Sequence, residues 1–451
     1  MSLTKRLNDS PMARWTVLFI VATAMMMGYF VNDVMSPLET MLEAPLTEGG
    51  LGWTPADYGF FSGASGLINV FLLMLFFSGL ILDKTGVRFT GRLACSLMVA
   101  GTLIKFIAVA HPSVGIFHVS LLASHFSLPA SAALASLGFA VFGVGYEMTG
   151  ITVSKAMVRW FTGHELAMAM GIQLAMARLG TAAALSVSAP IARRYALSTP
   201  LLLALALLIV GLLAFLVFCV MDKKLDADMA TESSEAGEES FRWSDIGETL
   251  RSPGFWLITL FCMLFYSAVS PFLKFSSKLM VAKYGVDADL AGFFSSIAPF
   301  GTILLTPLFG YVYDRFGHGV TLVIAGALLL TGVHFGFSLP MHSATMAIGL
   351  MVTLSIGYSL APAALWPCVP KIIPLKCLGT AYSMIFFIQN FGRTIIPTLV
   401  GKANEADPSY TASMLIFGFT ALGATAIAVI MLIVDKRKKY GLQLPNISLT
   451  V

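Results

Sequence analysis

Two charged side chains in apolar surroundings are the residues of this sequence most suited to chemistry. Glu147 and Arg178 lie in the stretch Gly143–Gly180, which reads as two apolar helices joined by a short basic loop. Each lies about a dozen residues from that loop, so at about 1.5 Å per residue both sit roughly 18 Å from the same end of the helix pair. A carboxylate and a guanidinium in hydrocarbon are costly, and such residues usually face a bundle interior or a watery cavity.

The two charges allow two interpretations. They can pair with each other as a structural salt bridge. Alternatively they bind the two ends of a zwitterion, Glu147 taking an ammonium group and Arg178 a carboxylate through its bidentate fork. We keep both interpretations open.

Other polar groups are expected at a similar depth. Arg393 lies near the repeat equivalent of Arg178 but one turn further outward, where it can neutralise Asp33 or attract anions. Asp33 is expected in the outer gate, and Lys105 is expected to pack or snorkel rather than bind a ligand. Further expected cavity residues are uncharged and polar: Asn69, Tyr146, Gln173, Tyr266, Gln389 and Asn390.

Composition places these side chains in a membrane protein. The chain has 451 residues, of which 57% are hydrophobic and 12% charged, whereas soluble domains have about 25% charged residues. The net charge of +4 comes with no basic, aromatic-rich module, so we expect no nucleic-acid partner. The five cysteines lack metal-ligand spacing and read as small apolar core residues, and we expect no metal site, catalytic residue or cofactor.

Apolar runs of spanning length predict an all-α fold of twelve transmembrane helices. They lie near residues 15–36, 58–82, 90–110, 131–158, 165–191, 200–220, 253–276, 289–313, 319–339, 344–368, 377–400 and 410–434. We expect an N-terminal half at 1–221, an acidic, Ser/Glu-rich flexible linker at 222–252, and a C-terminal half at 253–451 that ends in a short basic tail.

Positive charge sets the expected orientation. With both termini in the cytoplasm, cytoplasmic segments hold about 19 of the 28 Lys and Arg residues and external loops about 5. Short tails favour a bacterial plasma membrane, with a lysosomal membrane expected for a eukaryotic source. We expect a monomer as the functional unit, with a homodimer as the alternative.

A repeated motif relates the halves. GLILDKTGVR (Gly79 to Arg88) follows the second span and GYVYDRFGHG (Gly310 to Gly319) follows the eighth. This pair resembles the major facilitator superfamily, whose two halves rock around a midplane cavity. The motif is expected to let helices approach closely and to form a cytoplasmic latch. Its residues are Gly79, Asp83, Lys84, Arg88, Gly310, Asp314 and Arg315.

Two segments fall outside this repeat. Residues His111–Pro129 form an insertion of about 19 residues in which His111, His118 and His125 recur at helical spacing. An external amphipathic segment on the membrane is preferred to a metal site or pH sensor. In the tenth span, Pro362, Pro367 and Pro370 predict a kinked helix that could act as a gate. Trp366 there is either a plug below the cavity or an interfacial aromatic.

A narrower resemblance is carried by three stretches. The chain resembles the lysosomal dipeptide transporter branch of the superfamily in three stretches. These are GYEMTGITVSKAMVRWFTGHELAMAMGIQLAMARLGT, ALWPCVPKIIPLKCLGTAYSMIFFIQNFGRT and GYFVNDVMSPLE. The resemblance implies that Glu147 and Arg178 bind the amino and carboxyl termini of a dipeptide. It also implies facilitated diffusion of dipeptides, often cationic ones, with a glycosylated accessory subunit in animals. Arg393 departs from the branch.

The sequence therefore predicts an alternating-access carrier of small zwitterions, most simply a dipeptide uniporter. The alternatives are a proton-coupled carrier of organic anions or other metabolites, and a receptor or scaffold that transports nothing. The E-x-x-E-R motif of proton-coupled oligopeptide carriers is absent from the first span. An enzyme is not expected, because no nucleophile–base set or phosphate-binding loop stands out.

Overall fold

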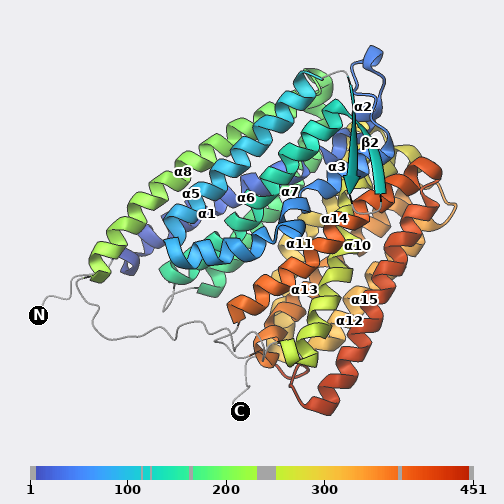
Figure 1. Cartoon of the computed structure of the whole chain (residues 1–451). Helices are drawn as coiled ribbons and strands as arrows, with labels where there is room; N and C mark the ends of the chain where they lie inside the picture. Colours follow the sequence, from blue (N-terminus) through green and yellow to red (C-terminus); the bar gives the residue numbers. More distant parts are fainter. Residues whose placement is uncertain are drawn as a thin grey trace, which may run out of the picture.

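The computed structural model describes residues 7–112, 115–121, 124–161, 166–230, 250–373 and 378–445 as a bundle of long helices (Figure 1). The long helices of the N-terminal half are α1 (Pro11–Asp33), α5 (Met74–Ala110), α6 (Ala130–Phe161), α7 (Leu166–Arg194) and α8 (Thr199–Ala230). Those of the C-terminal half are α10 (Pro253–Tyr284), α11 (Ala288–Phe316), α12 (Gly319–Ser338), α13 (Ala344–Ile372), α14 (Leu378–Ala406) and α15 (Thr411–Lys438).

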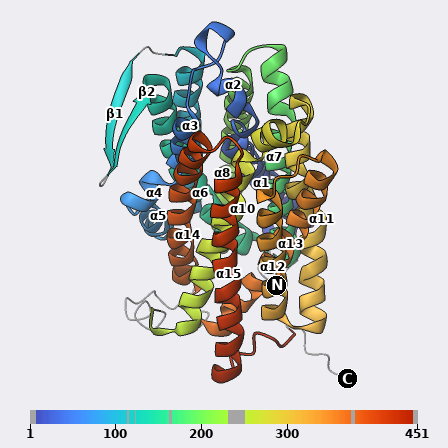
Figure 2. The ribbon, with the colours of Figure 1, turned by 90° about the vertical axis from the view of Figure 1, so that its right-hand side faces the viewer.

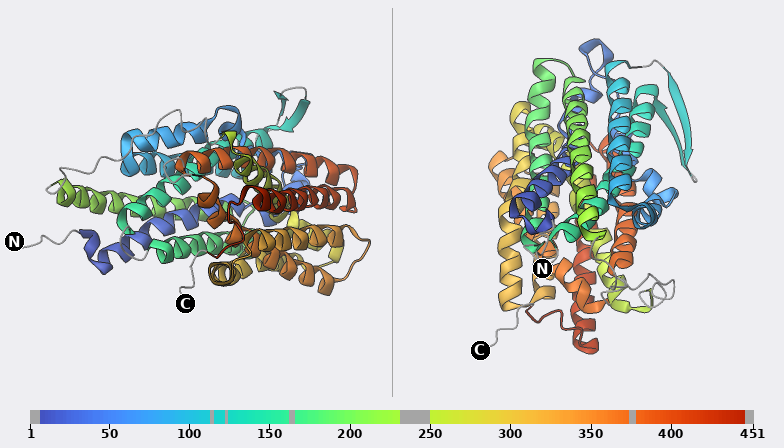
Figure 3. Two further views of the ribbon diagram at one scale, coloured as in Figure 1. Left: turned by 90° about the horizontal axis from the view of Figure 1, so that it is seen from below. Right: turned by 90° about the vertical axis from the view of Figure 1, so that its left-hand side faces the viewer.

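Short elements lie at the two ends of the bundle. Both termini and η1 (Leu7–Asp9) lie at one end, which we call the terminal face (Figures 1 and 3). The opposite end, which we call the hairpin face, carries the remaining short elements. These are η2 (Ser36–Leu38), α2 (Glu39–Glu43), η3 (Leu46–Glu48), and strands β1 (Ile116–Leu121) and β2 (Ser124–Pro129). Two further short helices, α3 (Pro55–Ala64) and α4 (Leu67–Phe71), lead from there into α5.

The all-α membrane fold predicted from the apolar runs is confirmed. Ten helical segments of the described chain are long and apolar enough to cross a membrane. Two predicted crossings are not among them, namely the second, which is broken, and the eleventh, α14, which carries Gln389, Asn390 and Arg393. Within the N-terminal half α1 packs on α7 and α8, and α5 on α6, while in the C-terminal half α12 packs on α13 and α15.

The expectation of one continuous helix over 58–82 is wrong. The chain forms α3 and α4 and then restarts as α5 after Leu73, whose φ of 54° is left-handed. Glycines bring α3 against α14, and a Cβ added at Gly59 would lie 2.6 Å from the Pro397 carbonyl oxygen. We attribute the break to this close approach, which favours local packing over a straight helix.

The last glycine of the repeated motif has a positive φ in both halves. Gly86 interrupts α5 with a φ of 76°, and Gly317 ends α11 with a φ of 74°. Left-handed φ values are accessible to glycine at little cost. The motif therefore marks two equivalent turns at the terminal face, and the second and third spans are joined there by a single glycine rather than a loop.

The insertion is a β-hairpin, so the helical spacing assigned to its three histidines is wrong. β1 and β2 pair antiparallel, with Ser120 opposite His125 and His118 opposite Ser127. Phe117, Val119 and Leu121 alternate with polar residues, which is the period of a strand. The hairpin projects from the side of the bundle at the hairpin face (Figure 2).

Two predicted segments lie at the terminal face. Helix α8 continues to Ala230, so the first residues of the predicted linker are helical, and 231–249 lie outside the described residues. Helix α13 runs through Pro362, Pro367 and Pro370, and the kink expected there stays a prediction. A proline removes one hydrogen bond but does not by itself end a helix held by its neighbours.

The halves are joined to each other chiefly near the hairpin face. The Tyr58 hydroxyl donates to the Lys274 carbonyl over 3.0 Å, and the hydroxyls of Ser186 in α7 and Ser296 in α11 lie 3.0 Å apart. Arg193 and Asp289 form an ion pair of 2.9 Å. Lys278 pairs with Glu39 and Glu43 across the same boundary.

Candidate functional site

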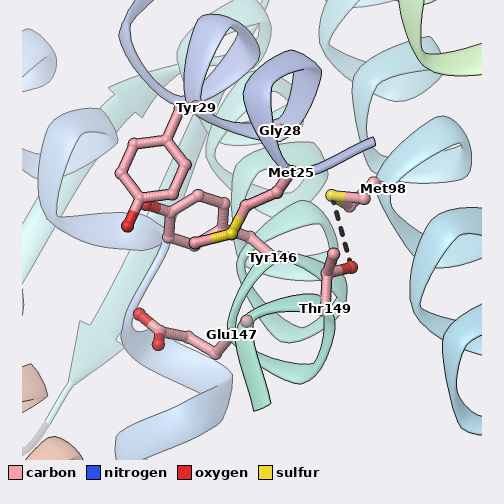
Figure 4. A pocket seen from close by; sticks show the side chains of 8 residues that line it. Met25, Gly28, Tyr29, Met98, Tyr146, Glu147 and Thr149 are labelled. Carbon is pink, nitrogen blue, oxygen red and sulfur yellow. Dashed lines mark hydrogen bonds between the residues drawn. The ribbon is translucent and has the colours of Figure 1, made fainter. Parts of the chain in front are cut away.

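A small cavity lies between α1, α5 and α6 near the middle of the bundle (Figure 4). Its volume is about 40 Å³, and residues from all three helices line it: Met25, Gly28, Tyr29, Met98, Tyr146, Glu147, Thr149 and Gly150. Gly28 makes room, because a Cβ there would lie 3.2 Å from the Met98 sulfur. Since ligand pockets usually enclose 300 Å³ or more, this cavity beside Glu147 is too small to be a whole binding pocket.

Glu147 forms an ion pair with Arg393, and Arg178 is not its partner. The Arg393 Nη1 atom lies 2.8 Å from Glu147 Oε1, and the two side chains are 18% and 16% exposed. The pair connects α6 of one half to α14 of the other. In the described residues Glu147 and Arg178 form no ion pair with each other, so the structural salt bridge considered from the sequence is absent from this conformation.

Arg178 contacts the opposite half through an aromatic ring. Its guanidinium carbon lies 4.7 Å from the centroid of the Tyr358 ring in α13. Tyr29, Tyr146 and Tyr266 are close enough to interact with the same guanidinium electrostatically. A guanidinium stacked on an aromatic face keeps its N–H edges free for a planar carboxylate.

Tyr29 and Tyr146 connect the two charged groups. Their rings pack 5.0 Å apart between centroids, and both interact electrostatically with Arg178 and with Arg393. Figure 4 shows the Glu147 carboxylate next to these two rings. Glu147 and Arg178 therefore share a tyrosine-lined space although they do not touch.

The predicted amide residues divide into two groups. Asn69 donates to the Gly143 carbonyl over 3.1 Å, and Gln173 donates to the Met25 sulfur over 3.2 Å. The side-chain carbonyl oxygens of Asn69, Gln173 and Gln389 are buried without a hydrogen-bond partner, so each offers an acceptor. Asn390 differs, because its amide donates to the Phe386 carbonyl of its own helix.

Asp33 is neutralised by Lys274 rather than by Arg393. The Lys274 Nζ atom lies 3.9 Å from Asp33 Oδ1, and the Thr181 hydroxyl donates to Asp33 Oδ2 over 2.8 Å. Lys274 also donates to the Asn32 carbonyl, which ties α10 to α1 near the hairpin face. This location agrees with a role for Asp33 where the halves meet.

Lys105 is a packed residue in this structure and does not reach toward water. It is fully buried, donates to the Val31 carbonyl over 3.3 Å, and lies over the rings of Phe139 and Phe142.

The motif residues contact their own halves at the terminal face. Arg88 pairs with Asp226 over 2.6 Å, and Arg159 pairs with both Asp222 and Asp226. Arg315 donates to the Tyr311 hydroxyl of its own helix. Each of these pairs lies within one half. The expected latch, which holds when the cavity opens outward and breaks when it opens inward, stays a prediction.

The other motif positions differ in their surroundings. A Cβ at Gly79 would meet the Ser383 hydroxyl of α14 at 3.9 Å, whereas one at Gly310 would meet nothing within 4 Å. Lys84 is exposed and Asp314 is half-buried, while the Asp83 side chain lies outside the described part of the structure.

Trp366 packs inside the C-terminal half, one residue before Pro367 in α13. Its indole N–H donates to the Tyr266 hydroxyl over 3.1 Å, and its ring also contacts Tyr382 and Phe386. Its role as a plug below the cavity or as an interfacial aromatic stays a prediction.

Sequence reasoning missed several residues of this region. Tyr29 and Tyr358 were not singled out, although with Tyr146 they share a signal, since each follows a glycine in a span. Asp222 and Asp226 were assigned to the linker. Among the described residues, no group of His, Cys, Asp and Glu side chains could hold a metal ion.

Comparison with known proteins extends the structural evidence. Residues 109–397 match the family described as Major Facilitator Superfamily. The chain is similar to a lysosomal dipeptide transporter, MFSD1, of Danio rerio, with 28% identity over 385 residues that cover 83% of this chain and 78% of the relative. The Homo sapiens protein of the same name is 26% identical over 318 residues, covering 68% and 67%.

Solved structures agree on the fold. A D-xylose–proton symporter superposes with a TM-score of 0.68 at 12% identity, covering 92% of this chain and 97% of the symporter. A POT family transporter in complex with a thioalcohol-conjugated peptide gives a TM-score of 0.66 at 16% identity, covering 93% and 96%. With helices in two halves, matching turns after the repeated motif and a family match over most of its length, the chain belongs to the Major Facilitator Superfamily of membrane transporters.

Proposed function

We propose that this protein transports dipeptides by alternating access, as a uniporter. The observation that carries the proposal is the placement of Glu147 and Arg178 around one tyrosine-lined space, each already in contact with the opposite half. A dipeptide has an ammonium at one end and a carboxylate at the other. Its length keeps these two charges apart, which suits Glu147 and Arg178 because these side chains form no ion pair with each other in the described structure.

Each end of the ligand has a matching group. Glu147 accepts the ammonium, whose N–H groups take the place of the Arg393 guanidinium. Arg178 takes the carboxylate through two parallel hydrogen bonds. The buried acceptor oxygens of Asn69, Gln173 and Gln389 are available for peptide N–H groups, since an unpaired buried acceptor gains most from a new donor.

The contacts between halves suggest the transport cycle. Hydrogen bonds and ion pairs join the halves at the hairpin face, while at the terminal face Arg88 and Arg159 pair with Asp226 of their own half. We assign this conformation to a state in which the site is reached from the terminal face, which positive charge places in the cytoplasm. Transport requires the hairpin-face contacts to break and terminal-face contacts to form.

Relatives named as lysosomal dipeptide transporters support the choice of solute. In proteoliposomes containing the purified protein, a neutral dipeptide should equilibrate without a proton gradient. Glu147→Gln and Arg178→Ala should each abolish this uptake while the protein keeps its detergent-solubilised elution profile. Undiminished uptake in both variants would overturn the proposal, and uptake that requires a pH gradient would favour a proton-coupled carrier.

A further inference from the structure

The site holds more positive than negative charge. Arg178 and Arg393 both interact electrostatically with Tyr29, Tyr146 and Tyr358, so the two guanidiniums face one group of rings. The carboxylate next to Tyr29 and Tyr146 is that of Glu147, which pairs with Arg393.

The surrounding charges do not correct the imbalance. Asp33 accepts hydrogen bonds from Thr181 and Asn32 and lies 3.9 Å from Lys274, so it is already paired. Lys105 is fully buried against the Val31 carbonyl and two phenylalanine rings, so it supplies no carboxylate to the site. The described charges at and near the site, apart from this buried lysine, are therefore three cations (Arg178, Lys274, Arg393) and two anions (Asp33, Glu147).

A simple zwitterion leaves one cation of the site without a partner. When the ligand ammonium takes Glu147 and the ligand carboxylate takes Arg178, Arg393 loses its counter-ion. Both side chains of the Glu147–Arg393 pair are less than one-fifth exposed, and leaving one member of such a pair alone is strongly unfavourable. A second carboxylate on the ligand removes this penalty.

We infer that Arg393 is a specificity-determining residue that selects dipeptides with an acidic side chain on the first residue. The inference rests on the proposed function. Because Arg393 contacts the carboxylate that receives the ammonium, the extra carboxylate belongs on the residue that carries the amino group. A cationic first residue would instead bring its side-chain ammonium toward Arg393, so this protein disfavours the cationic dipeptides that the family resemblance implied.

The test compares ligands that differ by one charge. Four dipeptides are compared: Asp-Ala, its isostere Asn-Ala, its positional isomer Ala-Asp, and Lys-Ala. Their binding is measured by calorimetry on the purified full-length protein and by competition in proteoliposomes. Asp-Ala should bind about tenfold tighter than Asn-Ala, the gain expected from one charge-assisted hydrogen-bonded contact. Ala-Asp should show a smaller gain, and Lys-Ala should bind most weakly.

Variants assign the selection to Arg393. In Arg393→Gln the ratio of Asp-Ala to Asn-Ala affinity should fall to about one, whatever happens to the absolute affinities. Arg393→Lys, which keeps the charge, should retain part of the ratio and provides a second variant if the first does not fold. Arg194→Gln, which removes an exposed arginine at the hairpin face, should retain the full ratio.

The outcomes separate the two proposals. If wild-type protein binds Asn-Ala as tightly as Asp-Ala, or if the ratio survives in Arg393→Gln, the inference about Arg393 is wrong and dipeptide transport stands. If none of the four dipeptides binds or competes, the proposed function itself is wrong.

Discussion

Arg393 of α14 donates to Glu147 of α6 over 2.8 Å, and this contact joins the two halves at the level of the site. The empty protein thus supplies its own cation for the carboxylate proposed to bind a ligand ammonium. A carboxylate that is paired in the ground state is released only if the ligand provides equal or better contacts. On the proposed function, this pair would couple ligand binding to separation of the halves.

A double-mutant cycle measures that coupling. Glu147→Gln leaves a guanidinium without a counter-ion, and Arg393→Gln leaves a carboxylate, so each should lower the free energy of unfolding by about 1–3 kcal/mol. The double variant should cost less than the two singles together, with an interaction energy of about 1–2 kcal/mol. Reversible unfolding in mixed micelles gives all four values. Strictly additive losses would show that the ion pair contributes nothing to stability.

Arg178→Lys tests the carboxylate end of the site. Lysine keeps the positive charge but loses the planar fork and the stacking on Tyr358. The affinity for a dipeptide with a free C-terminus should fall about 10–100-fold, and the affinity for the same dipeptide with an amidated C-terminus should change little. Tyr358→Phe is the matched control, because the ring remains under the guanidinium and only the hydroxyl is removed. An equal loss for both ligands would place Arg178 away from the carboxylate.

A disulfide between α7 and α11 tests whether the hairpin face must open. The hydroxyl oxygens of Ser186 and Ser296 lie 3.0 Å apart across the halves, so Ser186→Cys with Ser296→Cys places two thiols within bonding range. Oxidation should stop transport, and a reductant should restore it. Each single variant and the wild type, which has its own cysteines, receive the same treatment. Full transport by protein shown on a gel to be cross-linked would contradict alternating access at this face.

Much of the fold could be predicted because the bilayer imposes it. A spanning helix needs about 20 apolar residues, and α8, α12 and α15 are such runs. The repeated motif predicted that the two halves are related, and its last glycine has a positive φ in both of them, at Gly86 and at Gly317. The broken second span was not predictable in this way, since its shape depends on how closely α3 approaches α14, a contact between residues more than 300 positions apart.

The partners within the site depend on the relative rotation of the halves, which no local pattern encodes. Depth along a helix placed Glu147, Arg178 and Arg393 at similar levels, but it did not decide which arginine faces Glu147. Asp222 illustrates the opposite case. A charged run after an apolar span resembles a linker, yet this side chain is fully buried against Arg88 and Trp160 because α8 continues beyond the apolar run.

The contact between Gly59 and α14 leads to the last prediction. A Cβ at Gly59 would lie 2.6 Å from the Pro397 oxygen and 2.7 Å from the Gly401 Cα atom, distances that force α3 and α14 apart. Gly59→Ala should therefore favour the state in which the hairpin face is open.

The rate at which a membrane-impermeant maleimide labels Ser186→Cys, applied from the hairpin face, reports this shift. Labelling should be several-fold faster in the Gly59→Ala background, because about 1.4 kcal/mol changes an equilibrium tenfold. Gly349→Ala in α13 is the matched control, since a Cβ there meets nothing within 4 Å and alanine favours a helix. Equal labelling in the two backgrounds would mean that the α3–α14 contact does not hold the hairpin face closed.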